Sequence, residues 1–167
     1  TTFFGNDTIN LSGTLLGVSS LVQGGGGADV ITYATSLANG TGSTINGNAG
    51  GDSITLAETE VSSNLLLAGG AGGDTIAVTA DALASGMGTI HGGGGNDIIN
   101  VSAAGGTGAD VIIFGGAGAD TIGLGTQPES AVSAVNVRYT SFADSTLGAI
   151  DSISATVAIT GGFTISE

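Results

Sequence analysis

Residues 69–77 read GGAGGDTIA, a glycine-rich loop that ends in Asp74 and is followed two places later by Ile76. The same arrangement returns along the chain every 22 or 23 residues. A fixed period of this size is typical of a chain that coils and stacks on itself, so each turn places its aspartate on the same edge. The repeated aspartates are Asp7, Asp29, Asp52, Asp74, Asp97 and Asp120.

The residues after each aspartate alternate with a period of two, which is typical of a short strand with one buried face. An Ile stands at the second position after the aspartate, and an apolar or aromatic residue stands at the fourth. A second apolar group precedes the next glycine loop, and we expect its buried members to be Leu21, Ile45, Leu66 and Ile90. Each turn then has two strands, a glycine loop on one edge and a more variable connection on the other. The predicted fold is all-β, a right-handed parallel β-solenoid with about 22–23 residues per turn.

Asp110 falls outside this spacing. It belongs to the segment GGTGADVII from Gly105, and it lies 13 residues after Asp97 and 10 before Asp120, intervals that together restore the 23-residue period. We therefore expect Asp110 in a glycine loop on the opposite edge of the same turn. No matching loop stands one turn away, so this edge forms at best half of a site.

The chain divides into two predicted regions. Residues 1–125 carry the repeats and form the solenoid proper. Residues 126–167 keep the alternation, as in VNVRYTSF, but their loops lack the double glycine. We expect this flank to be a degenerate last turn, marked by Asp144, followed by capping or connecting strands.

The glycine segments resemble the nonapeptide GGxGxDxUx of RTX, or haemolysin-type, calcium-binding proteins. The resemblance runs from Phe4 to Gly123. It implies a β-roll that holds Ca²⁺ between the loops of successive turns, through aspartate carboxylates and through carbonyls of glycines and variable positions. On this chain the implied metal-binding residues are Asp7, Gly24, Gly25, Gly27, Asp29, Gly47, Ala49, Gly50, Asp52, Gly69, Ala71, Gly72, Asp74, Gly92, Gly94, Gly95, Asp97, Asp110, Gly115, Ala117, Gly118 and Asp120.

Elementary chemistry favours the same ion. Calcium takes six to eight oxygen ligands, and roughly four to six ions would suit this number of loops. Glycine tolerates the positive φ that turns carbonyls toward a shared point. The 14 acidic residues face a single base, Arg138, which gives a formal charge of −13. Such a chain is poorly suited to nucleic acid or anionic membranes, and it has no run of 18 apolar residues that predicts a membrane-spanning helix.

No catalytic constellation is present, so we expect no enzyme activity and no organic cofactor. His91 is the only histidine, and the chain contains neither a GxSxG nor an HExxH motif. Threonines near the loops are similar to those of ice-binding solenoids, but they alternate between the positions before and after the Ile and form no single rank. These threonines are Thr8, Thr32, Thr55, Thr75 and Thr121.

The resemblance implies a calcium-binding structural module, a fragment of a secreted bacterial cell-surface protein such as an S-layer protein, surface fibre or adhesin. Such a module leaves the cell unfolded, through type I secretion, and folds and self-associates into a layer or filament in extracellular calcium. The alternative is a C-terminal RTX export and folding domain of a secreted enzyme or toxin, and an ice-binding solenoid is a minor alternative.

Overall fold

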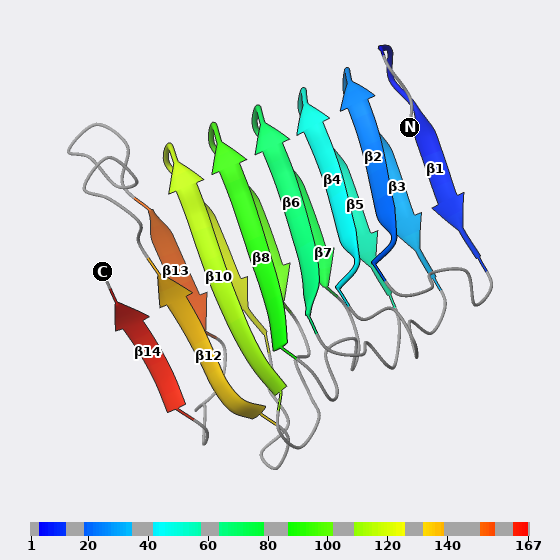
Figure 1. Ribbon diagram of the computed structural model, residues 1–167. Coiled ribbons are helices and arrows are strands. Elements are labelled where there is room, and N and C mark those ends of the chain that lie inside the picture. The colour runs from blue at the N-terminus through cyan, green and yellow to red at the C-terminus, as the bar shows by residue number, and fades with distance from the viewer. Residues whose placement is uncertain are drawn as a thin grey trace.

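The computed structural model describes residues 4–12, 19–34, 42–57, 64–78, 87–101, 109–125, 132–138, 151–155 and 162–166. These residues form fourteen strands and no helix, and the strands pair in parallel within two seven-stranded sheets (Figure 1). The odd-numbered sheet contains β1 (Thr8–Leu11), β3 (Val30–Tyr33), β5 (Ser53–Leu56), β7 (Thr75–Val78), β9 (Ile98–Val101), β11 (Thr121–Leu124) and β13 (Ser152–Ala155). The even-numbered sheet contains β2 (Leu21–Gly26), β4 (Thr44–Ala49), β6 (Leu65–Ala71), β8 (Met87–Gly94), β10 (Ala109–Ala117), β12 (Val132–Arg138) and β14 (Gly162–Ser166).

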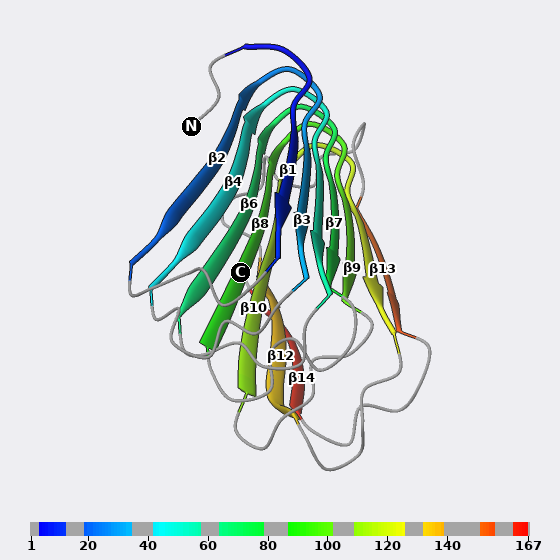
Figure 2. The ribbon, with the colours of Figure 1, turned by 90° about the vertical axis from the view of Figure 1, so that its right-hand side faces the viewer.

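The chain alternates between the two sheets and so winds a solenoid. Viewed from the N-terminal end, it ascends an even-numbered strand, crosses one edge and descends the next odd-numbered strand (Figure 2). This path turns clockwise as it recedes, so the coil is right-handed, the hand that parallel crossovers strongly favour. The predicted fold class is confirmed.

A single core fills the space between the sheets. Each Ile at the second position after an aspartate pairs with its equivalent in the next turn, as Ile54 does with Ile76. From β3 to β11, the second and fourth positions after the aspartate are at most 1% exposed. The core thus consists of stacked columns of like residues, as the period of two predicted.

Two residues that the sequence predicts to face the core do not face it. Leu21 is 61% exposed, and Leu66 is only partly buried. Their neighbours Val22 and Leu67 take the inward positions, because both align with the column of Ile45. Successive side chains of a strand face opposite sides, so an error of one residue in the register exchanges core and surface.

The flank after residue 125 extends the same two sheets. Strand β12 pairs with β10, β13 with β11, and β14 with β12. Asp144 lies outside the described residues. No helix in the described ranges is long and apolar enough to cross a membrane.

Candidate metal-binding edge

Short loops carry the chain from β2, β4, β6, β8 and β10 to the odd-numbered strand that follows each of them, along the edge at the top of Figure 2. Each of these loops ends in one of the repeated aspartates, and Asp7 takes the same place before β1. The structure therefore brings the six predicted aspartates to one edge. The loops are residues 27–29, 50–52, 72–74, 95–97 and 118–120.

Hydrogen bonds join these aspartates into a continuous ladder. The backbone N–H of each aspartate donates to Oδ1 of the aspartate in the next turn, for example from Asp29 to Asp52 at 2.8 Å and from Asp52 to Asp74 at 2.7 Å. The other steps measure 2.8 to 2.9 Å. We call this set the aspartate ladder, and its members are Asp7, Asp29, Asp52, Asp74, Asp97, Asp120 and Asp151.

Asp151 is a ladder residue that the sequence analysis missed. Its Oδ1 accepts the backbone N–H of Asp120 at 2.9 Å, although 31 residues separate the two. The signal was available, because Asp151 is followed at the second position by Ile153, as every other ladder aspartate is followed by an Ile. Asp151 lacks the glycine-rich segment and the 23-residue spacing that mark the other ladder aspartates.

Two positions of each glycine loop adopt positive φ. Counted from the first glycine of each glycine-rich segment, such as Gly69, they are the second and the fourth, for example Gly70 at 118° and Gly72 at 127°. A Cβ on Gly72 would overlap the carbonyl of Gly50 in the preceding turn. Asn48 occupies one second position with φ of 79°, a conformation that Asn tolerates better than most residues. Stacked backbones therefore favour glycine at these sites, and Asn takes the place of glycine at one of them.

The first glycine of each glycine-rich segment, which lies in an even-numbered strand, leaves room for the side chain of the aspartate five residues later. A Cβ on Gly47 would overlap Oδ2 of Asp52 and would stand 2.6 Å from the carbonyl oxygen of Gly69. Gly24 and Gly69 have the same arrangement with their own aspartates. A carboxylate oxygen and a carbonyl oxygen of the next turn thus both lie beside the space left by a missing side chain.

The second carboxylate oxygens of the inner ladder residues are buried and have no hydrogen-bond partner among the residues that the structure describes. This applies to Oδ2 of Asp29, Asp52, Asp74 and Asp97, whose side chains are at most 2% exposed. A buried carboxylate oxygen without a donor or cation is costly. Within the described part of the chain, no donor satisfies these four oxygens.

Burial changes the proton affinity of the same groups. Desolvation raises the pKa of Asp52 and Asp97 above the ordinary value, and it raises the pKa of Asp74 to about 6. Backbone hydrogen bonds oppose this rise, while the negative charges of Asp52 and Asp97 add to it at Asp74. The charged form is disfavoured wherever no cation is present.

Several backbone carbonyls that the sequence predicts as ligands already accept a hydrogen bond between turns. The carbonyls of Ala49, Ala71 and Ala117 accept N–H groups of the preceding turn at 2.7 to 2.8 Å, and that of Gly94 accepts at 2.6 Å, so one lone pair of each is in use. Asp110 lies near the start of β10, paired with Met87 and Ala134, at the strand end opposite the ladder. The expected opposite edge is correct, but Asp110 stands in a strand and not in a loop.

The donor set fits a hard cation. In the described ranges, no three His, Cys, Asp or Glu side chains come together as a metal site. An ion at this edge would therefore combine one or two carboxylates with backbone carbonyls, a mixture of oxygens that calcium accepts. The buried Oδ2 atoms and the nearby glycine carbonyls supply both kinds of ligand.

In comparisons with known proteins, no family model, no curated protein and no solved structure matches this chain.

Proposed function

We propose that this chain is a calcium-binding structural module of a secreted bacterial cell-surface protein, which folds and assembles when it meets extracellular calcium. The observation that carries the proposal is the row of buried Oδ2 atoms at Asp29, Asp52, Asp74 and Asp97, which have no hydrogen-bond partner in the described ranges. Bound Ca²⁺ supplies positive charge to such oxygens.

Charge supports the same function. The ladder stacks one carboxylate per turn, and neighbouring strands lie about 4.8 Å apart. Like charges at this spacing repel by about 1 to 4 kcal/mol per pair at effective dielectric constants of 80 to 20. The chain has one Lys or Arg against 14 acids, so protein cations are too few to relieve this repulsion. Binding of divalent ions would then contribute directly to the free energy of folding.

The functional setting follows from this coupling. A module that needs calcium stays unfolded where calcium is scarce and folds outside the cell, where sites with dissociation constants of about 10⁻⁴ to 10⁻³ M fill. We expect type I export and self-association into a layer or filament. Nothing in the ladder supplies a nucleophile with a positioned base, so the proposed role is structural.

The test is far-UV circular dichroism of the chain during a calcium titration from chelator to about 10 mM, with magnesium as the control ion. We expect a cooperative gain of β signal with calcium and little response to magnesium, because Mg²⁺ prefers a compact octahedral site and releases its waters reluctantly. A spectrum that is already β-rich in chelator and does not respond to calcium would contradict the proposal.

A matched pair of variants assigns the response to the edge. Asp74→Asn removes one ladder carboxylate, whereas Asp110→Asn removes the same charge at the opposite strand end. We expect Asp74→Asn to shift the calcium midpoint or lower the number of bound ions, and Asp110→Asn to leave both within error. Equal effects of the two variants would mean that total charge, and not the ladder, determines the response.

A further inference from the structure

The outer face of the odd-numbered sheet consists of two parallel ranks of small residues. The first and third positions after each ladder aspartate flank the inward-facing Ile, so both point away from the core. None of these positions is buried. The first-position rank is Thr8, Val30, Ser53, Thr75, Ile98, Thr121 and Ser152, and the third-position rank is Asn10, Thr32, Thr55, Ala77, Asn100, Gly123 and Ser154.

The repeated threonines therefore share one face, although their alternation about the Ile predicts no single rank. Thr75 and Thr121 belong to the first-position rank, and Thr32 and Thr55 belong to the third. The strands are in register, with Thr75 beside Ser53 and Thr32 beside Thr55. Alternation in the sequence becomes two ranks in the structure because residues two apart along a strand lie on the same side of the sheet.

The described part of this face carries no charged residue. None of its seven strands contains Asp, Glu, Lys or Arg, although the chain has a formal charge of −13. The inner ladder aspartates immediately before these strands are at most 2% exposed and do not lie on the face. Val30 and Ile98 are 43% and 44% exposed, and hydroxyl or amide groups stand at most of the other positions. The face is neutral, with methyl groups interspersed among hydroxyls and amides.

The two ranks form a regular grid. Strand pairing sets a repeat of about 4.8 Å along each rank, and two residues along a strand set a distance of about 6.6 Å between the ranks. Gly123 leaves no gap in its rank, because Oδ1 of Asn100 lies so near that a Cβ on this glycine would overlap it. No side chain in either rank is longer than Ile or Asn, so the face follows the single layer of strands seen end-on in Figure 2.

We propose that this face binds ice, an activity separate from calcium-dependent folding. Water beside methyl groups has restricted orientations, and hydroxyls and amides fixed at regular intervals anchor ordered water as donors and acceptors. Ice offers rows of water oxygens at spacings comparable to those of this grid. A charged group would impose a hydration shell of its own, so the absence of charge supports the proposal as directly as the regular spacing does.

The dimensions favour ice over a second copy of the chain. Strands of four residues cover about 13 Å and seven paired strands about 30 Å, which gives a face of roughly 400 Å². Two such faces would bury about 800 Å² together, below the roughly 1,200 Å² of a stable protein interface. Adsorption to ice adds one equivalent contact per strand, so the repeat itself supplies the affinity.

The experiment measures thermal hysteresis, the gap between the melting and freezing temperatures of an ice crystal held in the protein solution. It is run at one free calcium concentration at which circular dichroism shows a folded chain, and also in chelator if the chain is folded there. The result can then be read whether or not calcium drives folding. We expect a gap that grows with protein concentration, together with faceting of the crystal.

Matched variants assign the activity to this face. Thr75→Lys places a long charged side chain on β7, the middle strand of the odd-numbered sheet, whereas Thr89→Lys makes the same change on β8, the middle strand of the even-numbered sheet. Thr89 also points outward, since its neighbour Ile90 is in the core. We expect Thr75→Lys to abolish the hysteresis and Thr89→Lys to retain it. Asn100→Lys, at an exposed position of β9, takes the place of Thr75→Lys if that variant does not fold.

Three results would overturn the inference. One is the absence of hysteresis and faceting from folded wild-type protein. Another is an equal loss in Thr75→Lys and Thr89→Lys, which would mean that the added charge, and not the face, is responsible. The third is a wild-type dimer that Thr75→Lys converts to a monomer in analytical ultracentrifugation, because a second copy would then occupy the face.

Discussion

Gly72 and Gly94 both belong to the metal-binding edge, yet only one has a backbone that requires glycine. Gly72 has φ of 127°, and its Cβ would overlap the carbonyl of Gly50. A Cβ on Gly94 meets nothing within 4 Å, and Ala117 stands at the equivalent place in the next turn. The glycine repeat therefore mixes required positions with tolerant ones.

We expect Gly72→Ala to lower the free energy of unfolding by about 2 kcal/mol or more, through strain at positive φ and the overlap with Gly50. Gly94→Ala should be neutral or stabilise by up to about 1 kcal/mol, because alanine restricts the unfolded chain. Urea unfolding in saturating calcium measures both variants. Equal losses would show that the turns do not stack as described.

The pH response of the metal-free chain follows from the raised pKa values in the ladder. A raised pKa means that the folded state binds protons more tightly than the unfolded state, so folding is favoured below the unfolded value near 3.8. This contribution is lost as pH rises through about 6 at Asp74. In chelator we therefore expect more β structure at pH 4.5 than at pH 7.5, measured by circular dichroism at constant ionic strength. More β structure at pH 7.5 would contradict the inference that the charged ladder carboxylates destabilise the metal-free fold.

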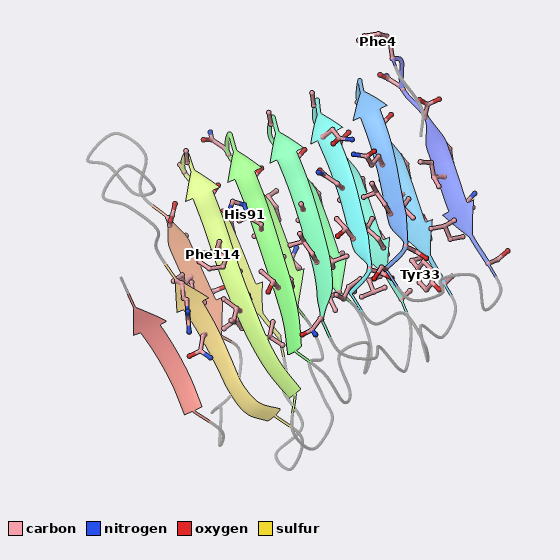
Figure 3. The ribbon with its side chains drawn as sticks, in the orientation of Figure 1. Phe4, Tyr33, His91 and Phe114 are labelled. Carbon is pink, nitrogen blue, oxygen red and sulfur yellow. The ribbon has the colours of Figure 1, made fainter. Side chains whose placement is uncertain are left out.

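Tyr33 provides a separate test of buried polarity. Its side chain is fully buried in the core, and its hydroxyl has no hydrogen-bond partner in the part of the chain that the structure describes (Figure 3). Tyr33→Phe removes this hydroxyl and keeps the ring, so we expect the free energy of unfolding to rise by about 1 kcal/mol. A thermal melt compares the variant with the wild type. A clear loss of stability would mean that the hydroxyl has a favourable contact.

At the scale of the strand, the sequence predicts the odd-numbered strands better than the even-numbered ones. Each odd-numbered strand follows its aspartate directly, so the loop fixes the register, and Ile31 and Tyr33 are buried as expected. The even-numbered strands follow variable connections, and runs such as Leu65–Leu67 are apolar at every position. Only the pairing of Leu67 with Ile45 decides which leucines face the core.

Leu67 and Leu66 test that register. Leu67 is 1% exposed and lies in the core column, whereas Leu66 is partly exposed on the outer face. We expect Leu67→Ala to cost about 2–5 kcal/mol and Leu66→Ala less than about 1 kcal/mol. Urea unfolding in calcium gives both values. The reverse order would place β6 one residue out of register.

The candidate site was predictable at the level of position but not of orientation. The 23-residue period gave the edge and six of its aspartates. In each inner aspartate, Oδ1 accepts a hydrogen bond from the preceding turn and Oδ2 is buried. This orientation depends on how the loops stack, and no local sequence pattern encodes it. Asp151 was missed for a related reason. The ladder continues without the glycine signature because a residue can take the aspartate's place after any connection that returns the chain to the edge.

At the scale of the whole molecule, the ladder links net charge to the fold. Replacing Asp29, Asp52, Asp74, Asp97 and Asp120 together by Asn removes five negative charges and keeps an oxygen at each step. The Asn Oδ1 can accept the same backbone N–H, and Nδ2 can donate to the glycine carbonyl that lies near each buried Oδ2 of the inner ladder. The repulsion among these five side chains disappears, and so do the unpartnered oxygens of Asp29, Asp52, Asp74 and Asp97.

We therefore expect the fivefold Asn variant to be β-rich in chelator and to lose its calcium response, whereas the wild type needs calcium for the same spectrum. Circular dichroism and calcium binding by calorimetry measure the two properties separately. A control with Asp110→Asn also lowers the negative charge, at the strand end opposite the ladder, and should keep the calcium requirement. If the Asn variant stays unfolded in chelator, the ladder charge is not what opposes folding, and the required ion acts through the glycine carbonyls instead. If it folds and still binds calcium at full stoichiometry, the ladder carboxylates are not the ligands.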